Sequence, residues 1–382
     1  MIYRQLGNTG ISASVIGLGS EGLVGMKEEN AVKLIGTAID EGVNYFDLYN
    51  PQPEARMNLG KGITGHRQEV YIQGHLCTAW ENGQYLRTRD LDKTRKSFET
   101  MCQLVGTDYI DVGMIHYVDK QEDFDTIFNG PLIEYVRQLK KEGRIHHIGI
   151  SSHNPVIAKK CVETGDIEVV LFAVNPAYDM TPPSEDLNDL WDDKSYEKAM
   201  LNIDPDRDAF HKLCATKHIG VSVMKAFAGG DLLNAKLSPF GVALTPTQCI
   251  HYALSQPGVT TVLGGFRNVE ELMQSVHYCE ATDSERDFAP VLSNIPKHSF
   301  RGKCMYCGHC APCSVGIDVA TVNKFYDLCV SENEIPETVR DHYKLLDHHA
   351  GECIRCGRCE RNCPFEVKII DEMKNAEKLF GY

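Results

Sequence analysis

Eight short apolar segments alternate with longer amphipathic segments over the first 290 residues of the chain. The apolar segments have the length of strands and lie at 15–18, 44–47, 70–74, 110–116, 147–151, 169–174, 221–225 and 260–263. Helical periodicity covers 28–41, 91–105, 123–142, 155–163, 205–218, 247–255 and 269–279. Eight strand–helix units predict an α/β fold of the closed (β/α)8 TIM-barrel type, preceded by a hairpin near Gly7 and Gly10. A doubly wound sheet is the alternative, because Gly17, Gly19 and Gly22 loosely match its phosphate-binding turn.

Polar residues collect where the predicted strands end. They are Asp47, His75, His116, Ser151, Ser152, His153, Asn175, Lys225 and Arg267. Active sites of (β/α)8 barrels lie at the C-terminal ends of the strands, so these side chains are predicted to surround one pocket. A single buried histidine is more often a satisfied polar group than a catalytic one, but the joint placement favours function. We expect at least two of Asp47, His75 and His116 to share a functional pocket.

Two runs of four cysteines lie near the end of the sequence. The first contains Cys304, Cys307, Cys310 and Cys313, and the second contains Cys353, Cys356, Cys359 and Cys363, followed by Pro364. Thiolates at this spacing bind iron-sulfur clusters, and in two-cluster ferredoxins the last cysteine of a run reaches the other cluster. The pattern predicts two 4Fe-4S clusters. One is held by Cys304, Cys307, Cys310 and Cys363, and the other by Cys353, Cys356, Cys359 and Cys313.

Structural zinc is the main alternative for these cysteines, because paired Cys-x2-Cys knuckles also bind zinc. The second run matches the pattern Cys-x2-Cys-x2-Cys-x3-Cys-Pro at every position, which favours clusters. The first run departs from the pattern, with a two-residue last gap and Ser314 in place of proline. Of the 15 cysteines, the seven outside the two runs are scattered singly and are predicted to be free thiols in a reducing compartment.

Composition limits the partners of the chain. A formal net charge of −14 without a basic block argues against nucleic acid. The apolar run at 169–174 is far shorter than the roughly 20 residues needed to cross a bilayer, so we expect no membrane span. The first ten residues lack the apolar core of a secretory signal. We therefore expect a cytoplasmic protein without disulfides.

Several motifs in residues 1–283 resemble the aldo/keto reductase superfamily. They read YRQLGNTG at 3–10, NYFD at 44–47, LGK at 59–61, DYIDV at 108–112, GRI at 143–145, IGIS at 148–151, KAFAGG at 225–230 and GVTTVLGG at 258–265. With the cysteine runs, the chain resembles a bacterial branch in which this barrel is followed by a ferredoxin-like domain. The resemblance implies a barrel at 1–283 and a small, largely helical two-cluster domain at 284–382, with helices expected at 319–330 and 336–346.

The resemblance also implies a reaction. Members of the superfamily pass a hydride from NADPH to a carbonyl compound, while a tyrosine donates the proton and lysine, aspartate and histidine tune it. The aspartate corresponds to Asp47 and the histidine to His116. Gln52 occupies the tyrosine position and His75 the lysine position, so the usual proton donor is missing. Tyr49 replaces it if its loop is reshaped, and His75 or His116 are the other candidates.

The cofactor contacts that the resemblance implies are altered as well. The usual serine-asparagine pair reads Ser151-Ser152, a glutamine becomes Leu171, and the aromatic that stacks on nicotinamide becomes Met224. These changes weaken the expected contacts to NADP(H). We predict cofactor contacts at Ser151, Ser152, Asn175, Lys225 and Arg267, with Arg267 as the partner of a cofactor phosphate.

Three functions are compatible with these features. The favoured one is an oxidoreductase whose barrel binds a small organic substrate and whose two 4Fe-4S clusters exchange electrons with a redox partner, such as a ferredoxin or flavodoxin, or with a nicotinamide cofactor. The second is an NADPH-dependent carbonyl reductase with relocated acid chemistry. The third is a noncatalytic barrel that relays electrons or binds a ligand. An acidic, turn-rich segment at 181–203 is predicted to form a loop over the pocket mouth.

Overall fold

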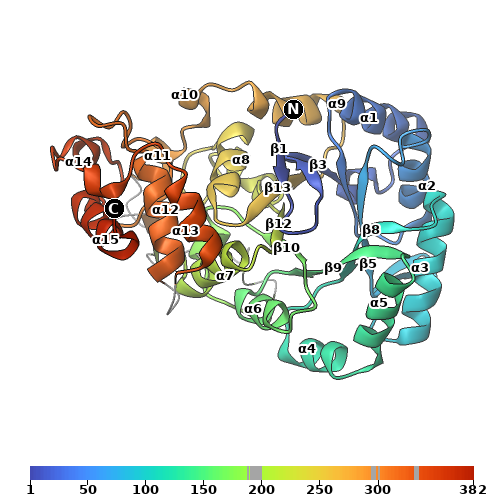
Figure 1. Ribbon diagram of the computed structural model, residues 1–382. Helices are drawn as coiled ribbons and strands as arrows, with labels where there is room; N and C mark the ends of the chain where they lie inside the picture. Colours follow the sequence, from blue (N-terminus) through green and yellow to red (C-terminus); the bar gives the residue numbers. More distant parts are fainter. Residues whose placement is uncertain (187–188, 190–199, 294–297, 300–301, 331–334) are drawn as a thin grey trace.

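Eight parallel strands close into a barrel in the computed structural model, which describes residues 1–186, 189, 200–293, 298–299, 302–330 and 335–382 (Figure 1). Following the chain, they are β3 (Ile16–Gly19), β4 (Tyr45–Leu48), β5 (Tyr71–Leu76), β8 (Ile110–Ile115), β9 (Ile145–Ser152), β10 (Val169–Ala173), β12 (Gly220–Met224) and β13 (Val259–Gly264). Neighbours in the chain are neighbours in the barrel, and β13 pairs with β3 to close it. The predicted barrel is therefore confirmed, and the doubly wound sheet is excluded.

Helices surround the barrel. They are α1 (Glu28–Asp40), α2 (Pro53–Gly62), α3 (Leu91–Val105), α4 (Gln121–Phe128), α5 (Pro131–Lys141), α6 (Pro155–Glu163), α7 (Pro205–Thr216), α8 (Pro246–Ser255) and α9 (Val269–Val276). The single helix predicted at 123–142 is wrong, because α4 ends before Gly130 and α5 begins at Pro131. Proline fits the first turn of a helix but not its interior, so the chain starts a new helix there. α2 lies outside the predicted helices.

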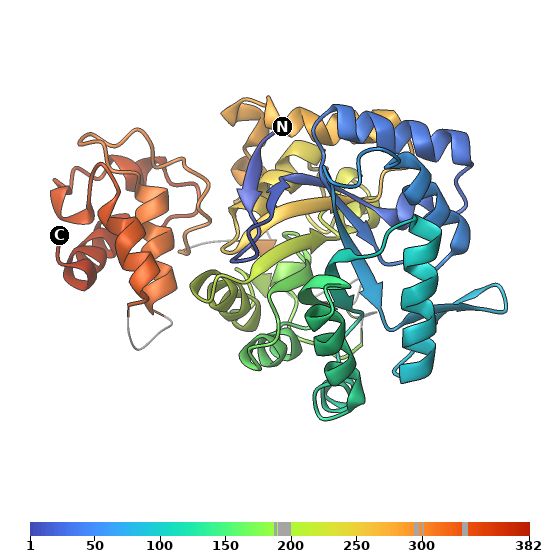
Figure 2. The ribbon, with the colours of Figure 1, turned by 45° about the vertical axis from the view of Figure 1, so that its right-hand side comes forward.

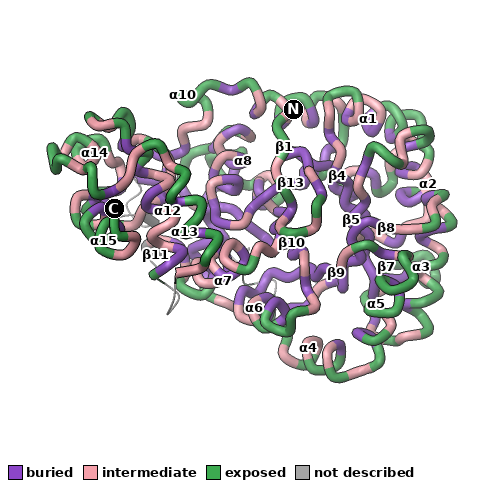
Figure 3. Tube along the Cα trace, in the orientation of Figure 1, coloured by how far each residue is buried: buried purple, intermediate pink, exposed green. Residues whose placement is uncertain are grey.

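The opening hairpin closes one end of the barrel. β1 (Tyr3–Gln5) pairs antiparallel with β2 (Ser12–Ser14), and Leu6 and Ile11 in the turn between them pack with Val112 inside the barrel. Figure 3 shows the strands of the barrel as the buried part of the trace. Because the hairpin fills the N-terminal end of the strands, the C-terminal end is the one left for a pocket.

A second hairpin follows β5 and stands out from the barrel (Figure 2). It consists of β6 (Thr78–Glu81) and β7 (Gln84–Arg87), joined by Asn82 and Gly83. Both turn residues have positive φ, 52° and 76°, as a two-residue hairpin turn of the primed type requires. The sequence analysis did not predict this hairpin, although an Asn-Gly pair between alternating apolar residues is a strong signal for one.

A helical segment lies beside the barrel, at the left of Figures 1 and 2. Its helices are α12 (Val319–Val330), α13 (Glu337–Lys344), α14 (Arg358–Asn362) and α15 (Ile369–Phe380), so the helices expected at 319–330 and 336–346 are confirmed. The short helices α10 (Asp283–Arg286) and α11 (Ala289–Leu292) precede it, and Phe288 between them contacts Tyr252 of α8 edge-on. A domain boundary between residues 283 and 284 stays a prediction.

The loop predicted at 181–203 lies largely outside the described residues. At its end, β11 (Met200–Leu201) pairs in parallel with β14 (His298–Ser299). Among the helices that the structure describes, none has the length and apolar character of a membrane span.

Gly7 is expected to tolerate no side chain. Its φ is +54°, and a Cβ there would lie 2.3 Å from the His218 carbonyl oxygen and 2.4 Å from the Gly220 nitrogen. Gly7→Ala should lower the free energy of unfolding by about 1–3 kcal/mol. Gly36→Ala is the control, because its Cβ meets nothing within 4 Å in α1 and alanine should raise stability by about 0.5–1 kcal/mol. Thermal melts check both variants, and an unchanged Tm for Gly7→Ala contradicts the expectation.

Candidate active site and cysteine centre

A cavity of about 750 Å³ opens at the C-terminal ends of the barrel strands. Its lining includes eight of the residues predicted for the pocket, namely Asp47, Tyr49, His75, His116, Ser151, His153, Lys225 and Arg267. The predicted pocket thus forms where the barrel architecture places active sites.

Asp47, His75 and His116 form a continuous hydrogen-bonded line in this cavity. His75 Nε2 lies 2.9 Å from Asp47 Oδ1, and His75 Nδ1 lies 2.7 Å from His116 Nδ1. Asp47 is the third residue of β4, His75 the fifth of β5, and His116 follows the end of β8, so three adjacent strands supply the line. The structure brings all three residues together, as expected.

The Gln73 side chain, on the neighbouring strand β5, fixes the orientation of the Asp47 carboxylate. Its Nε2 donates to Asp47 Oδ1 at 2.7 Å, while its Oε1 accepts from the hydroxyls of Tyr45 at 2.9 Å and Ser222 at 2.8 Å. Because two hydroxyl donors face Oε1, the amide can only present its NH₂ group to the carboxylate. Asp47 Oδ1 therefore receives hydrogen bonds from both Gln73 and His75.

Tyr85 extends the line beyond His116. Its hydroxyl lies 2.8 Å from His116 Nε2, and its side chain lines the cavity from β7 of the projecting hairpin. Ser151 Oγ lies 3.3 Å from His116 Nδ1, on the other side of the ring. The sequence analysis missed Tyr85, because it did not predict the hairpin that carries it; the Asn82-Gly83 turn is the signal that points to it.

The contacts of the line determine where its protons lie. An ionised Asp47 only accepts, so His75 Nε2 carries a hydrogen and, with His75 neutral, its Nδ1 accepts from His116 Nδ1–H. His116 Nε2 then accepts from the Tyr85 hydroxyl. Burial, reinforced by the neighbouring His75, holds the pKa of His116 well below its usual value. His116 is therefore neutral near pH 7, which disfavours an imidazolium at that position as the acid.

Tyr49 lies over the imidazole ring of His116. Its ring centroid is 6.1 Å from that of His116 with an angle of 16° between the planes, and its hydroxyl donates to a carboxylate oxygen of Glu21. Burial, together with Glu21, raises the pKa of Tyr49. Gln52, at the family's tyrosine position, instead accepts from the Gly25 N–H at 3.2 Å through Oε1 and is not part of the cavity lining.

The predicted cofactor residues divide into two groups. Ser151, Lys225 and Arg267 line the cavity. Ser152 does not, and its hydroxyl donates to Asp119 Oδ1 at 2.9 Å. Asn175 is also outside the lining, and its Nδ2 donates to the Lys225 carbonyl oxygen at 2.9 Å. These two buried side chains stabilise the backbone at the strand ends.

The apolar substitutions noted in the sequence do face the cavity. Leu171 and Met224 belong to its lining, where the family's glutamine and aromatic residue would contact nicotinamide. The cavity also extends to Arg267, Glu271 and Gln274, away from the line of histidines. The cavity lining therefore combines the polar line of Asp47, His75 and His116 with apolar and charged side chains.

A second, small cavity lies in the helical segment and is lined by four cysteines. They are Cys304, Cys307, Cys310 and Cys363, the set predicted for one cluster. Phe365, Val367 and Ile369 complete its apolar wall. The thiol donor set and its partly buried position fit a 4Fe-4S cluster, because thiolates are its usual ligands.

The second predicted ligand set stays a prediction, and one contact between the two cysteine runs lies beside it. Ser314, which follows Cys313 of the first run, has its Oγ 3.5 Å from the Cys356 sulfur of the second run. The backbone N–H groups of His309 and Arg358 donate to Cys307 and Cys356, respectively. Such N–H···S contacts stabilise cluster thiolates.

The two runs share a backbone conformation. In each, the residues on both sides of the second cysteine have positive φ, at Tyr306 and Gly308 in the first run and at Arg355 and Gly357 in the second. All 15 cysteines lie in the described part of the chain, and none of them is joined in a disulfide. The described residues contain no group of three or more histidine, cysteine, aspartate or glutamate side chains close enough to bind a single metal ion. A cubane holds its thiolates further apart, since each binds a different iron.

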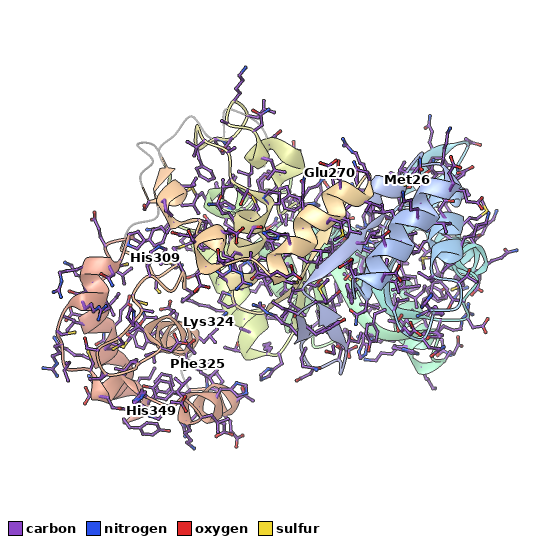
Figure 4. The ribbon with its side chains drawn as sticks, turned by 90° about the horizontal axis from the view of Figure 1, so that it is seen from above. Met26, Glu270, His309, Lys324, Phe325 and His349 are labelled. Atoms are coloured by element: carbon purple, nitrogen blue, oxygen red, sulfur yellow. The ribbon has the colours of Figure 1, made fainter. Side chains whose placement is uncertain are left out.

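The first run lies at the pocket end of the barrel. Lys303 ion-pairs with Asp208 in the first turn of α7 at 2.8 Å, and His309 pairs with Asp287 at 2.9 Å. The Asp287 carbonyl in turn accepts from Gln248 in the first turn of α8. Helices of this architecture begin where the strands end, so both contacts are near the cavity rim. Figure 4 shows His309 and Lys324 on the side of the segment that faces the barrel.

Comparison with known proteins agrees with this geometry. The family model for the aldo/keto reductase family matches residues 15–240. The chain is 25% identical to an oxidoreductase of Bacillus subtilis named YqkF, over 74% of this chain and 92% of that protein. It is 23% identical to the aldo-keto reductase YhdN of the same organism, over 77% of this chain and 94% of that protein.

Among solved structures, the chain is similar in fold to the holo form of the aldo-keto reductase AKR11C1 from Bacillus halodurans. The TM-score is 0.58 at 21% identity, covering 75% of this chain and 94% of the other. A putative aldo-keto reductase from Pseudomona aeruginosa gives a TM-score of 0.55, also at 21% identity, covering 73% of this chain and 94% of that one. The chain belongs to the aldo/keto reductase family and is an oxidoreductase.

Proposed function

We propose that this chain is an iron-sulfur oxidoreductase of the aldo/keto reductase type, which interconverts a small carbonyl compound and its alcohol and exchanges electrons through two 4Fe-4S clusters. One observation carries the proposal. The same chain has a hydrogen-bonded line of Asp47, His75 and His116 in a barrel cavity and a second cavity lined by four cysteines from two ferredoxin-like runs.

In the barrel, the polar line would act on the oxygen of the substrate. Asp47 orients His75 through its Nε2–H, and His75 and His116 hold or pass a proton between their Nδ1 atoms. Leu171 and Met224 offer an apolar surface to the organic part of the substrate. Because the hairpin of β1 and β2 closes the N-terminal end of the barrel, water can enter the cavity only through its mouth at the C-terminal end of the strands.

In the helical segment, the predicted ligand sets would each hold one cluster. When bound, the two clusters supply two one-electron steps, which match the two-electron difference between a carbonyl and an alcohol. The proposal includes residues 284–382 as the ferredoxin-like domain, a cytoplasmic location and a ferredoxin or flavodoxin as redox partner. The position of the first run beside α7 and α8 supports an electron path toward the barrel cavity.

A second candidate is an NADPH-dependent carbonyl reductase, with the clusters mainly stabilising the end of the chain. The extension of the cavity to Arg267 and Gln274 favours it, because a guanidinium there suits a cofactor phosphate. Leu171 and Met224 oppose it, since neither provides the amide contact or ring stacking that the family uses.

One anaerobic experiment separates these candidates. Reconstituted protein is titrated with NADPH and then with reduced ferredoxin, while nucleotide fluorescence, cluster absorbance and turnover of a carbonyl panel are recorded. Cluster bleaching by ferredoxin that is reversed by a carbonyl compound supports the proposal. Nucleotide binding with turnover but without cluster reduction supports the second candidate. Bleaching without turnover of any carbonyl or alcohol contradicts both.

The ligand sets are tested by metal content. The intact chain should contain about eight iron and eight acid-labile sulfide per chain, and Cys363→Ala should reduce both to about four, because Cys363 completes only one set. Cys279→Ala is the control, since Cys279 lies outside both runs. Substantial zinc without sulfide would overturn the assignment.

Asp47→Asn tests the polar line. The amide can donate to His75, which would reverse the protons along the line, so kcat should fall by about 10²–10⁴-fold with iron content unchanged. Asp125→Asn on α4 is a matched control, because that carboxylate is exposed and accepts from the Gln121 side chain, outside the cavity. Steady-state kinetics on the best substrate of the panel measure both, and a loss of less than about threefold for Asp47→Asn contradicts the assigned role.

A further inference from the structure

We propose that Tyr85 is the catalytic residue that exchanges a proton with the substrate oxygen, taking the place of the tyrosine that Gln52 replaces. The inference rests on the proposed interconversion of carbonyl and alcohol. It adds a residue from the hairpin of β6 and β7, an element outside the barrel strands that carry Asp47, His75 and His116.

Tyr85 has the two contacts that such a residue needs. Its hydroxyl lies 2.8 Å from His116 Nε2, the end of the buried line, and its side chain lines the cavity. The residue is 41% exposed, so a substrate can approach it while the hydroxyl keeps its bond to His116. The neighbouring Tyr49 also lines the cavity, but its hydroxyl donates to the Glu21 carboxylate, and its contact with His116 is ring stacking.

The donors of the line all point in one direction. Tyr85 donates to His116 Nε2, His116 Nδ1 donates to His75 Nδ1, and His75 Nε2 donates to Asp47 Oδ1. A proton that enters at Tyr85 can therefore be passed along by one shift at each bond. It ends on His75, where the imidazolium lies beside the Asp47 carboxylate.

In alcohol oxidation the balance is as follows. The substrate O–H bond breaks and its proton binds Tyr85 Oη, as the Tyr85 proton moves to His116 Nε2 and the His116 Nδ1 proton moves to His75. The carbon-bound hydrogen leaves either as a hydride, taken up by an oxidant of the nicotinamide class, or as two electrons that pass to the redox partner of the proposed function and a proton that is released to water. Carbonyl reduction is the reverse, in which Tyr85 donates its proton to the oxygen.

The surroundings of His116 favour passing a proton on to His75 over holding it on the His116 ring. Besides burial and His75, the charges of Arg89, His153 and Arg87 face it and oppose an imidazolium. Arg89 is fixed there, since its Nη1 donates to the His116 carbonyl oxygen at 2.8 Å. A proton that reaches His116 is therefore passed on to His75 instead of being held.

The test compares Tyr85→Phe with two other tyrosine variants. Tyr85→Phe should lower kcat by about 10²–10⁴-fold in both directions with little change in substrate KM, because it removes the proton route and leaves the cavity. Tyr3→Phe is the control; its hydroxyl donates to the Gly42 carbonyl at the far end of the barrel. If Tyr49→Phe loses far more activity than Tyr85→Phe, Tyr49 is the proton-exchanging residue and the inference is overturned.

A measurement without turnover accompanies the kinetics. In ¹⁵N-histidine NMR spectra, Tyr85→Phe should shift an imidazole Nε2 resonance and Tyr3→Phe should not, because one variant removes a hydrogen bond to His116. If the wild-type protein turns over a substrate and the Tyr85→Phe variant retains half of that activity or more, this inference is overturned but the proposed function is not. Absence of wild-type turnover on carbonyls and alcohols overturns the proposed function and this inference with it.

Discussion

The buried carboxylate of Asp47 is the constraint on which the rest of the site depends. A charge at this position is tolerated only when donors surround it, and Gln73 and His75 provide them from β5. Both point into the barrel because they are two residues apart on one strand, and the register pairs Asp47 with Gln73. His75 is therefore held in place by Asp47, and it determines in turn which nitrogen of His116 carries hydrogen.

Much of the fold could be predicted from the sequence because its signal is periodic. Eight apolar segments separated by amphipathic ones leave few arrangements other than a closed barrel. The errors are local. The break between α4 and α5 follows from a single Pro131, and the hairpin of β6 and β7 depends on the two-residue turn at Asn82. Such features change the chain direction without disturbing the surrounding hydrophobic pattern.

The candidate site was predictable to the extent that strand ends converge on one rim. Position along the chain does not say which way a side chain points. Ser151 and Ser152 are adjacent on β9, and alternation sends one to the cavity and the other to Asp119. The Asn175 side chain forms its hydrogen bonds with backbone groups of Lys225 and Ala177. In the cysteine runs, by contrast, the grouping rests on spacing and stays a prediction, although Cys304 and Cys363 do line one cavity.

The projecting hairpin contributes to the cavity from outside the barrel strands. Asp47, His75 and His116 belong to the barrel strands and their ends, where any shift disturbs a packed core. The hairpin is a short ribbon joined to the barrel at its base, with an exposed two-residue tip. Its length and its remaining side chains can vary without repacking the interior. Changes elsewhere in the hairpin can therefore alter how Tyr85 is presented to the cavity, while the barrel strands hold Asp47 in place.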